Sequence, residues 1–405
     1  MYKVMVRDNM SPVAKRILEA SGKISVVVDN DKATSGPKVL SKIIGEFHGL
    51  AVRSGTRVTE AVLKNAGQLK VIGRAGIGVD NIDVPAATKQ GIVVMNAPGG
   101  NTITTAEHTI SLMLSLARNI PQATESLRQG KWEKKKLSGI EITGKTLGVI
   151  GLGHIGRVVA DRAQGLKMVV IATDPYVSKE AAKALDVELV PLDELLMRSD
   201  FITLHVPRLK ETIGMINETT LKKMKQGVRI INCSRGEVVN IEDLYQAVLS
   251  GHVAGAALDV LPQEPPEPDL PILRHPNVIF TPHLGASTGE AQEKVADMIA
   301  TQMADFLLDG IITNAVNFPS LPIEVMNQLR PHLDLTEKMG SLMGQLVREI
   351  HDITVSYSGS VTDLDTRPLT HAALKGLLGS FTDTPVNYDL SRRHPRRMDD
   401  CHSEY

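Results

Sequence analysis

Three side chains in the second half of this 405-residue chain have the types that oxidation of a hydroxy acid needs. Arg235 follows the run IINCS, Glu264 follows ALDVLPQ, and His283 follows VIFTP. An arginine can hold a carboxylate through two parallel hydrogen bonds. A histidine, with an ordinary pKa of about 6.5, can take up and return a proton at neutral pH, and a carboxylate beside it fixes its tautomer. Each residue alone fits a surface ion pair, but the three together predict a site that removes a hydride and a proton.

The strongest local motif is a glycine-rich turn, Gly151-Leu-Gly153-His-Ile-Gly156, between the apolar run TLGVI and a helical stretch that starts at Arg157. Its glycines suit a tight turn, close approach of a pyrophosphate, and packing of a helix on a strand. Asp174 ends the next apolar run, where its carboxylate can accept hydrogen bonds from ribose hydroxyls and repel a 2′-phosphate. We therefore predict that the chain binds NAD rather than NADP.

A second glycine cluster, Gly73-Arg-Ala-Gly76-Ile-Gly78, also follows a strand-like run. It lacks the long helix and the downstream acid of a dinucleotide site. It fits a simple turn, and it fits equally an anion cradle of backbone N–H groups with Arg74 beside it. The local sequence leaves both interpretations open.

These candidate residues stand at the ends of short β-branched runs that alternate with helical patterns. The first series of runs is Lys3–Arg7, Ile24–Val28, Gly49–Ser54, Lys70–Gly73 and Ile92–Asn96. The second series is Thr146–Ile150, Met168–Thr173, Phe201–Val206, Arg229–Cys233, Gly255–Val260 and Val278–Thr281. The alternation predicts an α/β protein with two doubly wound parallel sheets, a Rossmann-type NAD domain and a flavodoxin-like substrate domain. Ligands bind beyond the carboxyl ends of such strands, so the candidate residues are expected at one edge.

The expected domains are a substrate-binding domain over residues 1–97, completed by 287–318, and an NAD-binding domain over 98–286. Helices are expected over Asn101–Ile120 and from Thr288 to Leu308, the second after the capping-box pair Ser287 and Glu290. Residues 319–405 are expected to form an incomplete C-terminal α+β domain with an irregular tail. Its expected elements are a helix over Pro322–Asp352, a strand over Ile353–Tyr357 and a helix over Leu369–Leu378.

Composition excludes several classes of protein. The chain has 45 Lys+Arg against 46 Asp+Glu, a net charge of −1, which argues against binding to nucleic acid or to an anionic membrane surface. Its two cysteines make neither a disulfide framework nor a CxxC metal pattern. No segment reaches the ~18 apolar residues of a membrane span, and the N-terminus does not have the pattern of a signal peptide. We therefore expect a cytoplasmic protein.

The segments INCSRGEVVN, AALDVLPQEPP, TPHLGAST, GLGHIG and GRAGIGVDNID together resemble the D-isomer-specific 2-hydroxyacid dehydrogenases. The resemblance covers about residues 1–380. It implies NAD-dependent oxidation of a small phosphorylated 2-hydroxy acid to the 2-oxo acid, without a metal. It places the catalytic arginine, glutamate and histidine of that family on Arg235, Glu264 and His283.

The resemblance also implies a set of NAD contacts. It places them on Ile77, Gly151, Gly153, His154, Ile155, Gly156, Asp174, Val206, Pro207, Cys233, Ser234, Arg235, Asp259, His283, Leu284, Gly285 and Ala286. The position of Ile77 is often threonine in relatives, so a contact from a side-chain hydroxyl is lost there.

Substrate contacts and a dimer follow from the same resemblance. The substrate contacts fall on Arg53, Ser54, Arg74 and Gly76. Relatives build a homodimer mainly from the nucleotide domain, which predicts a dimer, or a higher homo-oligomer, through the Asn101–Ile120 helix and the loop over 131–135. A basic residue of this loop reaches the neighbour's active site in relatives, so Lys134 and Lys135 are further candidates for phosphate binding.

The C-terminal part departs from the family pattern. VSYSGSVTDLDTRPLTHAALKGLLG resembles the start of an extra regulatory-side domain, but the pattern stops near Asn387–Tyr388 and becomes SRRHPRRMDDCHSEY. We interpret the chain as a truncated or alternatively terminated form. Because half a sheet cannot bury its apolar face, we expect residues 320–405 to be poorly packed and serine not to inhibit the chain.

Two other functions remain open. The first is a glyoxylate/hydroxypyruvate-type 2-hydroxyacid reductase; Arg53, Arg74 and the lysines of 131–136 favour a doubly charged phosphate over its smaller substrates. The second is a non-catalytic NAD-binding protein, like the transcriptional corepressors that share this fold and keep the catalytic trio. The C-terminal extension favours the enzyme.

Overall fold

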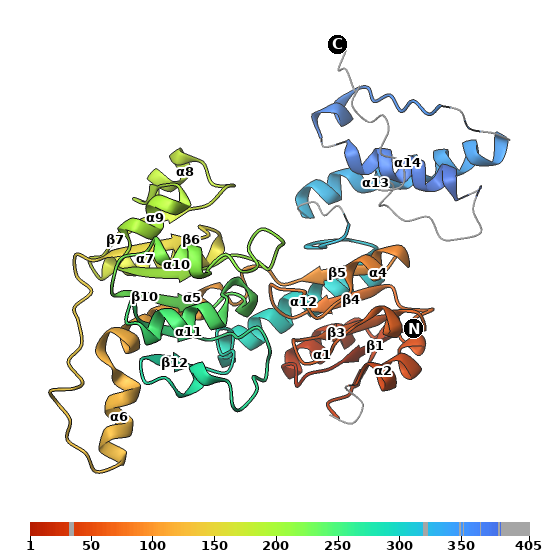
Figure 1. The fold of residues 1–405 in the computed structure, drawn as a ribbon. Helices are drawn as coiled ribbons and strands as arrows, with labels where there is room; N and C mark the ends of the chain where they lie inside the picture. Colours follow the sequence, from red (N-terminus) through yellow and green to blue (C-terminus); the bar gives the residue numbers. More distant parts are fainter. Residues whose placement is uncertain are drawn as a thin grey trace. The chain divides into compact units, whose positions relative to one another are not determined.

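The computed structural model describes residues 1–31, 36–318, 323–347, 350, 352–364, 366–379 and 381. The chain forms two compact units (Figure 1). One consists of Met1–Gly100 together with the chain from Gln292 onward, and the other is Asn101–Ala291. A parallel sheet with helices on both faces forms the centre of each unit, which confirms the predicted fold class. The three-domain division expected from the sequence stays a prediction.

The sheet of the first unit has five parallel strands in the order β2-β1-β3-β4-β5. They are β1 (Tyr2–Val6), β2 (Ile24–Val28), β3 (Gly49–Val52), β4 (Val71–Arg74) and β5 (Val93–Asn96). One face packs on α1 (Pro12–Glu19) and α12 (Gly289–Asp309). The other packs on α2 (Pro37–Ile43), the short helix η2 (Ile44–Glu46), α3 (Glu60–Leu63) and α4 (Val84–Lys89). Both faces are buried, which explains the continuous apolar runs in the strand sequences.

The sheet of the second unit has seven strands in the order β12-β11-β10-β9-β6-β7-β8. They are β6 (Thr146–Ile150), β7 (Val169–Thr173), β8 (Glu188–Leu189), β9 (Phe201–Leu204), β10 (Val228–Asn232), β11 (Val253–Leu258) and β12 (Val278–Phe280). One face packs on α5 (Thr102–Arg118), α7 (His154–Gly165) and α8 (Lys179–Lys183). The other packs on α9 (Leu192–Arg198), α10 (Glu218–Lys222), α11 (Ile241–Leu249) and the short helix η4 (Pro271–Arg274). The predicted strands are present, and β8 is an additional strand of two residues.

Helix ends near the predicted site have identifiable caps. The expected helix over residues 101–120 is α5, which stops at Asn119 because this residue adopts a left-handed conformation with φ 52°. A second helix, α6 (Ile120–Arg128), follows at once. At the start of α12, Thr288 Oγ1 accepts a hydrogen bond from the Ala291 N–H at 3.2 Å, so the capping residue is one later than the expected Ser287.

The C-terminal elements differ in part from expectation. The two expected helices are α13 (Ile323–Leu346) and α14 (Arg367–Leu378), with the short helix η5 (Ser360–Asp363) before α14. The expected strand over residues 353–357 is wrong, because the described residues give it no strand to pair with. Gly340 and Gly376 let α13 and α14 approach closely, since a Cβ at Gly376 would overlap the carbonyl oxygen of Glu337. The expected irregular tail lies outside the described residues.

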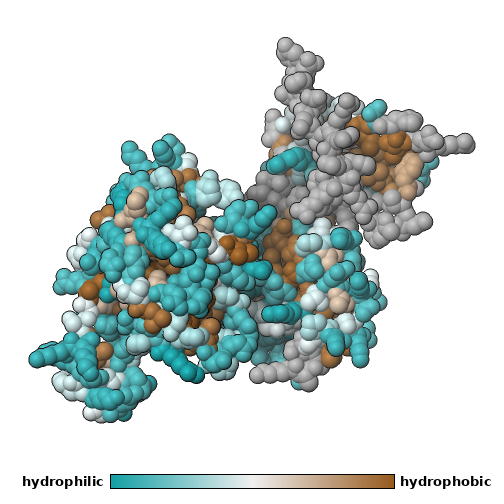
Figure 2. All heavy atoms as spheres, viewed as in Figure 1, coloured by the Kyte–Doolittle hydropathy of each residue, from teal (hydrophilic) through white to brown (hydrophobic). Residues whose placement is uncertain are grey.

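Apolar side chains remain exposed on α13, and Figure 2 shows apolar surface over this part of the chain. The exposed residues are Leu335, Met339, Leu342, Met343 and Leu346. Helix α13 thus packs closely on α14 but also exposes apolar side chains. The expected poor packing of residues 320–405 therefore stays a prediction. Within the described residues, no helix has both the length and the apolar character needed to cross a lipid bilayer.

Candidate active site

The candidate residues of the second unit follow the carboxyl ends of its parallel strands. The chain leaves β6 at Gly151, β7 at Asp174, β9 at His205, β10 at Cys233, β11 at Asp259 and β12 at Thr281. Strand order reverses between β9, β6 and β7, and such a switch point opens a crevice at the carboxyl edge of a doubly wound sheet. The fold therefore brings these loops to one edge, as the sequence predicts.

The glycine turn after β6 has a separate requirement at each glycine. Gly151 has φ 95°, and a Cβ there would lie 2.5 Å from the carbonyl oxygen of His205. A Cβ at Gly156 would overlap the carbonyl oxygen of Gly151, so the third glycine lets α7 pack on the turn. Gly153 faces open space and caps α7 without any side-chain hydrogen bond. The first N–H groups of α7 therefore have no side-chain cap, which suits binding of a pyrophosphate.

Asp174 lies directly beside this turn. One carboxylate oxygen accepts a hydrogen bond from the Leu152 N–H at 2.8 Å, and the other accepts one from the Tyr176 N–H at 2.8 Å. The residue is half-buried, and each oxygen has a further lone pair. The carboxylate is therefore fixed next to the glycine turn with acceptor capacity for ribose hydroxyls.

The loop after β10 carries Arg235 and is held by the fully buried side chain of Asn232. Asn232 Oδ1 accepts hydrogen bonds from the N–H and the hydroxyl of Ser234, at 3.0 and 2.8 Å. Its Nδ2 donates to the carbonyl oxygen of Arg235 at 2.9 Å. The guanidinium of Arg235 is half-buried, and its Nη1 donates to the Ser234 carbonyl at 2.7 Å. The backbone on both sides of Ser234 is therefore fixed by one amide.

Gly236 brings the loops of Arg235 and Glu264 together. It begins the short helix η3 (Gly236–Val238), and a Cβ there would overlap the backbone of Leu261. Glu264 Oε1 accepts a hydrogen bond from the Leu261 N–H at 3.2 Å. Glu264 Oε2 lies 2.7 Å from Nδ1 of His283. The carboxylate and imidazole are each about two-fifths exposed, so the pair is accessible to a substrate.

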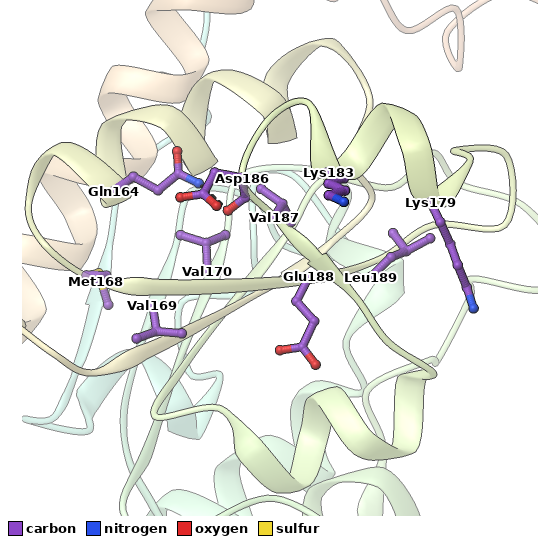
Figure 3. Close-up of a pocket in the computed structure, with 10 residues that line it drawn as sticks. All are labelled: Gln164, Met168, Val169, Val170, Lys179, Lys183, Asp186, Val187, Glu188 and Leu189. Carbon is purple, nitrogen blue, oxygen red and sulfur yellow. Dashed lines mark hydrogen bonds between the residues drawn. The ribbon is translucent and has the colours of Figure 1, made fainter.

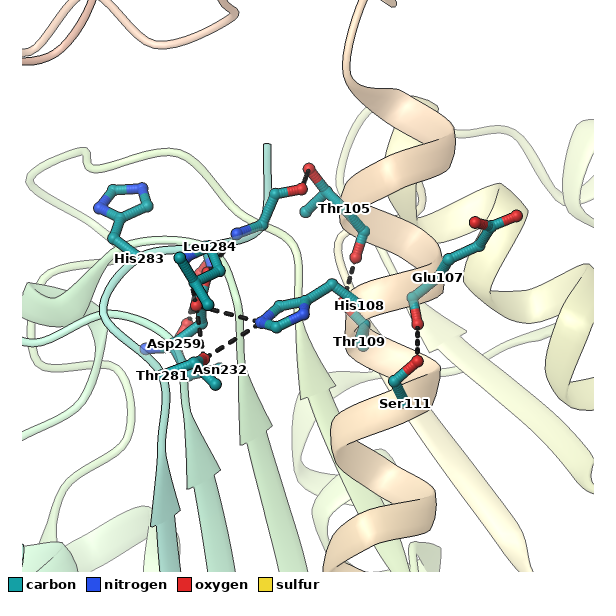
Figure 4. A network of polar contacts seen from close by, with 12 residues as sticks. Thr105, Glu107, His108, Thr109, Ser111, Asn232, Asp259, Thr281, His283 and Leu284 are labelled. Atoms are coloured by element: carbon teal, nitrogen blue, oxygen red, sulfur yellow. Dashed lines mark hydrogen bonds and ion pairs between the residues drawn. The ribbon is translucent and has the colours of Figure 1, made fainter. Parts of the chain in front are cut away.

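The backbone of His283 is held in an unusual conformation. Its φ is 56°, in the left-handed region that non-glycine residues seldom adopt. Its N–H donates to the carbonyl oxygens of Asp259 and Thr281, at 2.8 and 2.9 Å. Figure 4 shows that the ring points away from the polar contacts beneath it. The surrounding loop therefore determines where the imidazole points.

Those contacts centre on Asp259, whose side chain is almost fully buried. Its Oδ1 accepts hydrogen bonds from the Leu284 N–H at 2.7 Å and the Thr281 hydroxyl at 2.6 Å, and its Oδ2 accepts one from the Gly285 N–H at 2.8 Å. His108 Nε2, from α5, lies 3.1 Å from both Asp259 Oδ1 and Thr281 Oγ1 (Figure 4). Burial by itself would raise the pKa of Asp259, but these hydrogen bonds, with that of His108 foremost, lower it. The network holds the loop that carries His283.

Cys233 lies among the predicted cofactor contacts but is not chemically active. It is buried, and burial raises the pKa of its thiol to about 12. The thiol is therefore protonated at neutral pH and cannot act as a nucleophile. The Val206–Pro207 turn, another expected contact, follows β9 directly after His205.

In the first unit, Arg53 and Arg74 lie at one edge of the sheet. Arg74 ends β4 and pairs in register with Val52, the residue before Arg53. Gly76 has φ 147°, and a Cβ there would overlap the Arg74 guanidinium, so glycine lets that side chain fold over the turn. Ile77 is half-buried, and its carbonyl oxygen accepts a hydrogen bond from Asn96 at 2.7 Å. Ser54 is exposed beside Arg53.

Two features of the second unit lie away from this carboxyl edge. Lys134 and Lys135 occupy an exposed turn after α6, which follows no strand. A hollow of about 630 Å³ lies beside the amino-terminal start of β7, between β8 and α8 (Figure 3). It is lined by residues such as Met168, Lys183 and Glu188 and contains none of the predicted site residues.

Comparison with known proteins identifies the family. Residues 110–285 match the model of the D-isomer specific 2-hydroxyacid dehydrogenase, NAD binding domain, and residues 328–392 match the D-3-phosphoglycerate dehydrogenase intervening domain. The D-3-phosphoglycerate dehydrogenase of Archaeoglobus fulgidus is 46% identical over 386 residues, 95% of this chain and 72% of the relative. The chain belongs to the D-3-phosphoglycerate dehydrogenase family. The enzyme of the same name from Synechocystis is also 46% identical, over 96% of this chain and 69% of the relative.

Solved structures agree with this family. D-Lactate dehydrogenase from Aquifex aeolicus, complexed with NAD and lactic acid, superposes with a TM-score of 0.68 at 29% identity, over 78% of this chain and 100% of that one. As a D-3-phosphoglycerate dehydrogenase family member, the chain is an NAD-binding oxidoreductase.

Sequence reasoning missed the residues that hold the site loops. The sequence singles out neither Asn232 nor His108. In the first unit it also does not single out Asp8, which accepts a hydrogen bond from the Arg53 N–H, or Asn81, which donates to the Arg53 carbonyl oxygen. A buried asparagine at the end of an apolar strand, directly before CSR, is a signal that was available for Asn232. His108 lies in the middle of an amphipathic helix, where nothing local distinguishes it from a surface residue.

Proposed function

We propose that the chain oxidises 3-phospho-D-glycerate to 3-phosphohydroxypyruvate, the first step of phosphorylated L-serine biosynthesis, with Arg235, Glu264 and His283 as its catalytic residues. The observation that carries this proposal is the 2.7 Å contact between Glu264 and His283, on loops that follow neighbouring strands. The C2 hydrogen leaves as a hydride and the hydroxyl proton leaves to a base, so the products are the 2-oxo acid, NADH and a proton.

His283 is the base in this proposal. With Nδ1 donating to Glu264 Oε2, its Nε2 carries the lone pair that accepts the hydroxyl proton. Glu264 fixes that tautomer and stabilises the imidazolium that forms. Arg235 binds the substrate carboxylate and draws electron density from the neighbouring carbon.

The residues of the second unit fit NAD. Bound NAD⁺ supplies the acceptor for the hydride. The N-terminus of α7, where Gly153 provides no side-chain cap, suits the pyrophosphate, and the Asp174 carboxylate accepts hydrogen bonds from ribose hydroxyls. Oδ2 of Asp259 accepts one described hydrogen bond and keeps a lone pair for an amide donor.

In the first unit, Arg53 and the Arg74–Gly76 turn are the proposed ligands of the anionic substrate. Both arginines lie on the edge formed by β3 and β4. A phosphate and a carboxylate require several donors and positive charge, which these residues and the backbone N–H groups of their loops supply. Lys134 and Lys135 remain weaker candidates for a contact made from a second copy of the chain.

A homodimer through the second unit is the proposed assembly. The apolar residues of α5 are mostly buried within the unit, so α5 itself offers little free apolar surface. The region after it exposes Ile120, Leu127 and Trp132, with Trp132 82% exposed. This region is the proposed contact, because large exposed apolar side chains mark interaction surfaces. Cytoplasmic residence stays a prediction from the sequence.

The proposal is tested by following NADH formation from 3-phosphoglycerate and NAD⁺ with the wild type and with His283→Ala. We expect the wild type to turn over and the variant to lose about 10²–10⁴-fold in kcat, because a general base contributes that much. NADH binding, followed by fluorescence, should be retained in the variant. Near-normal turnover by the variant would remove His283 as the base, and an inactive wild type that binds NADH would favour a corepressor-like binding protein.

A further inference from the structure

A loop of the first unit, residues 53–56, is held at both ends by two side chains that the proposed reaction does not use. Asp8 follows β1 and Asn81 follows β4, whereas the loop follows β3. Asp8 Oδ2 accepts hydrogen bonds from the N–H groups of Arg53 and Thr56, at 2.8 and 3.0 Å. Its Oδ1 accepts one from the Thr56 hydroxyl at 2.6 Å.

Asn81 contacts the backbone carbonyl groups of the same two residues. Its Nδ2 donates to the carbonyl oxygens of Arg53 and Thr56, at 2.8 and 2.7 Å. An acid, which only accepts, therefore faces the two N–H groups, and an amide, which donates twice, faces the two carbonyls. The backbone polar groups at both ends of the loop are satisfied by this matched pair.

The middle of the loop keeps two backbone donors that form no hydrogen bond with the described residues. Ser54 and Gly55 are exposed, and among the described residues neither N–H donates a hydrogen bond. Thr56 is fully buried, so the loop is fixed beneath this tip. A Cβ at Gly55 would lie 3.0 Å from Asp8 Oδ1, so glycine lets the tip rest on the carboxylate.

A carboxylate under an anion-binding loop opposes the charge of the ligand, which calls for a reason beyond electrostatics. Asp8 itself has φ 62°, a costly conformation for a non-glycine residue. Three hydrogen bonds to one loop offset that cost.

We propose that Asp8 and Asn81 are positioning residues that set the Arg53–Thr56 loop so that the Ser54 and Gly55 N–H groups and the Arg53 side chain bind one anionic group of the substrate. The inference rests on the proposed function, since it assumes that this loop binds 3-phosphoglycerate. Neither residue touches the substrate in this proposal, and neither contributes to the NAD site in the second unit.

The test compares the effect of each substitution on the KM for 3-phosphoglycerate with its effect on the KM for NAD⁺. Asn81→Asp keeps the size of the side chain but turns an acceptor toward two carbonyls, so we expect the KM for 3-phosphoglycerate to rise about tenfold or more. The KM for NAD⁺ and kcat should stay within about twofold. Asp8→Ala should behave in the same way, and it replaces Asn81→Asp if that variant does not fold.

Two controls make the result specific. Asp8→Asn keeps an oxygen for the two N–H groups and turns its amide toward the Thr56 hydroxyl, so it should stay within about twofold of the wild type. Asp83→Ala removes the N-cap of α4, whose Oδ1 accepts from the Ala86 N–H at 3.0 Å, and should lower the melting temperature without changing either KM. Unchanged substrate KM in folded Asn81→Asp or Asp8→Ala would overturn the inference, as would an Asp8→Asn defect equal to that of Asp8→Ala. A wild type inactive on 3-phosphoglycerate would instead overturn the proposed function.

Discussion

Both units fix a loop through an aspartate at the end of a strand, but the two loops expose different groups. In each unit an aspartate at a strand end accepts backbone N–H groups of a loop that follows another strand. Asp259 holds Leu284 and Gly285 in the second unit, and Asp8 holds Arg53 and Thr56 in the first. The difference lies in what each loop leaves exposed.

In the second unit the loop presents a side chain. Asp259 is 2% exposed, is joined by His108 and Thr281, and fixes a histidine whose φ of 56° costs about 1–3 kcal/mol. In the first unit the loop presents backbone donors, and the aspartate is half-buried. A base needs one orientation of its ring, whereas an anion is held by several N–H groups. We therefore propose that the loop of the second unit orients a base and that the loop of the first unit binds an anion.

Among the variants that test this comparison, Arg235→Lys is expected to have the largest effect. Arg235→Lys keeps the charge but loses the planar fork, so we expect kcat/KM for 3-phosphoglycerate to fall about a hundredfold. Arg208→Lys is a matched control, because Arg208 is exposed and pairs with Glu237 at 2.9 Å next to the same short helix. Steady-state kinetics of both variants measure this, and equal behaviour of the two would remove Arg235 from carboxylate binding.

Variants of His108 test whether the orientation of the His283 ring affects the rate when His283 itself is unchanged. His108→Leu removes one donor from Asp259 and Thr281, and the loosened loop should lower kcat about ten- to hundredfold. Hydride transfer should become rate-limiting, so the kinetic isotope effect with substrate deuterated at C2 should increase. His108→Gln restores an N–H donor and should recover most of the rate.

Ser111→Ala provides the control on the same helix, since its hydroxyl donates to the Glu107 carbonyl oxygen of that helix. If His108→Leu changes the melting temperature but leaves the isotope effect as in the wild type, His108 is a purely structural residue.

A variant of Asp174 tests the proposed cofactor contact at the carboxyl edge of the second sheet. Asp174→Ala should reduce the preference for NAD⁺ over NADP⁺ in kcat/KM about tenfold, because it removes an acceptor for the ribose and a charge that repels a 2′-phosphate. The ratio is the informative quantity, since loss of the Leu152 contact weakens both cofactors alike. Asp161→Ala, on the exposed side of α7, should leave the ratio unchanged. An unaltered ratio in Asp174→Ala would contradict the ribose contact.

The last prediction concerns the pH dependence of stability rather than catalysis. Burial lowers the pKa of His205 to about 3 from its ordinary value of 6.5. Between these values the unfolded chain binds more protons than the folded chain, so the free energy of unfolding falls as the pH falls. His205→Gln removes this group and should flatten the decline between pH 6.5 and 4 in denaturant titrations. Parallel curves for wild type and His205→Gln would contradict the buried neutral imidazole.

The sequence predicted the parts of the molecule that local patterns determine. Continuous apolar runs mark buried parallel strands, and the spacing of Gly151, Gly153 and Gly156 marks the dinucleotide turn. Arg235, Glu264 and His283 were found because their types suit the chemistry and because they follow strand-like runs. The structure shows the Glu264–His283 contact and leaves their roles to be tested.

The rest depends on contacts between distant segments. Asp8 and Arg53 are 45 residues apart, and His108 and Asp259 are 151 apart, so nothing near either residue reveals its partner. The sequence does not predict strand β8, because two residues are too few to show a strand-like pattern of side chains. The strand expected at residues 353–357 was wrong because a β-branched run does not make a strand without a neighbour to pair with.

The most direct test of the whole account compares 3-phosphoglycerate with D-glycerate as substrates for the wild type. The two differ only in the phosphate, which we assign to anion-binding groups such as those of the first unit. Initial rates of NADH formation at several concentrations give kcat/KM for each. The account predicts a preference for 3-phosphoglycerate of about a hundredfold or more, since charge-assisted hydrogen bonds to one phosphate are lost with D-glycerate. Equal or better oxidation of D-glycerate would contradict it and would favour a hydroxypyruvate-type reductase.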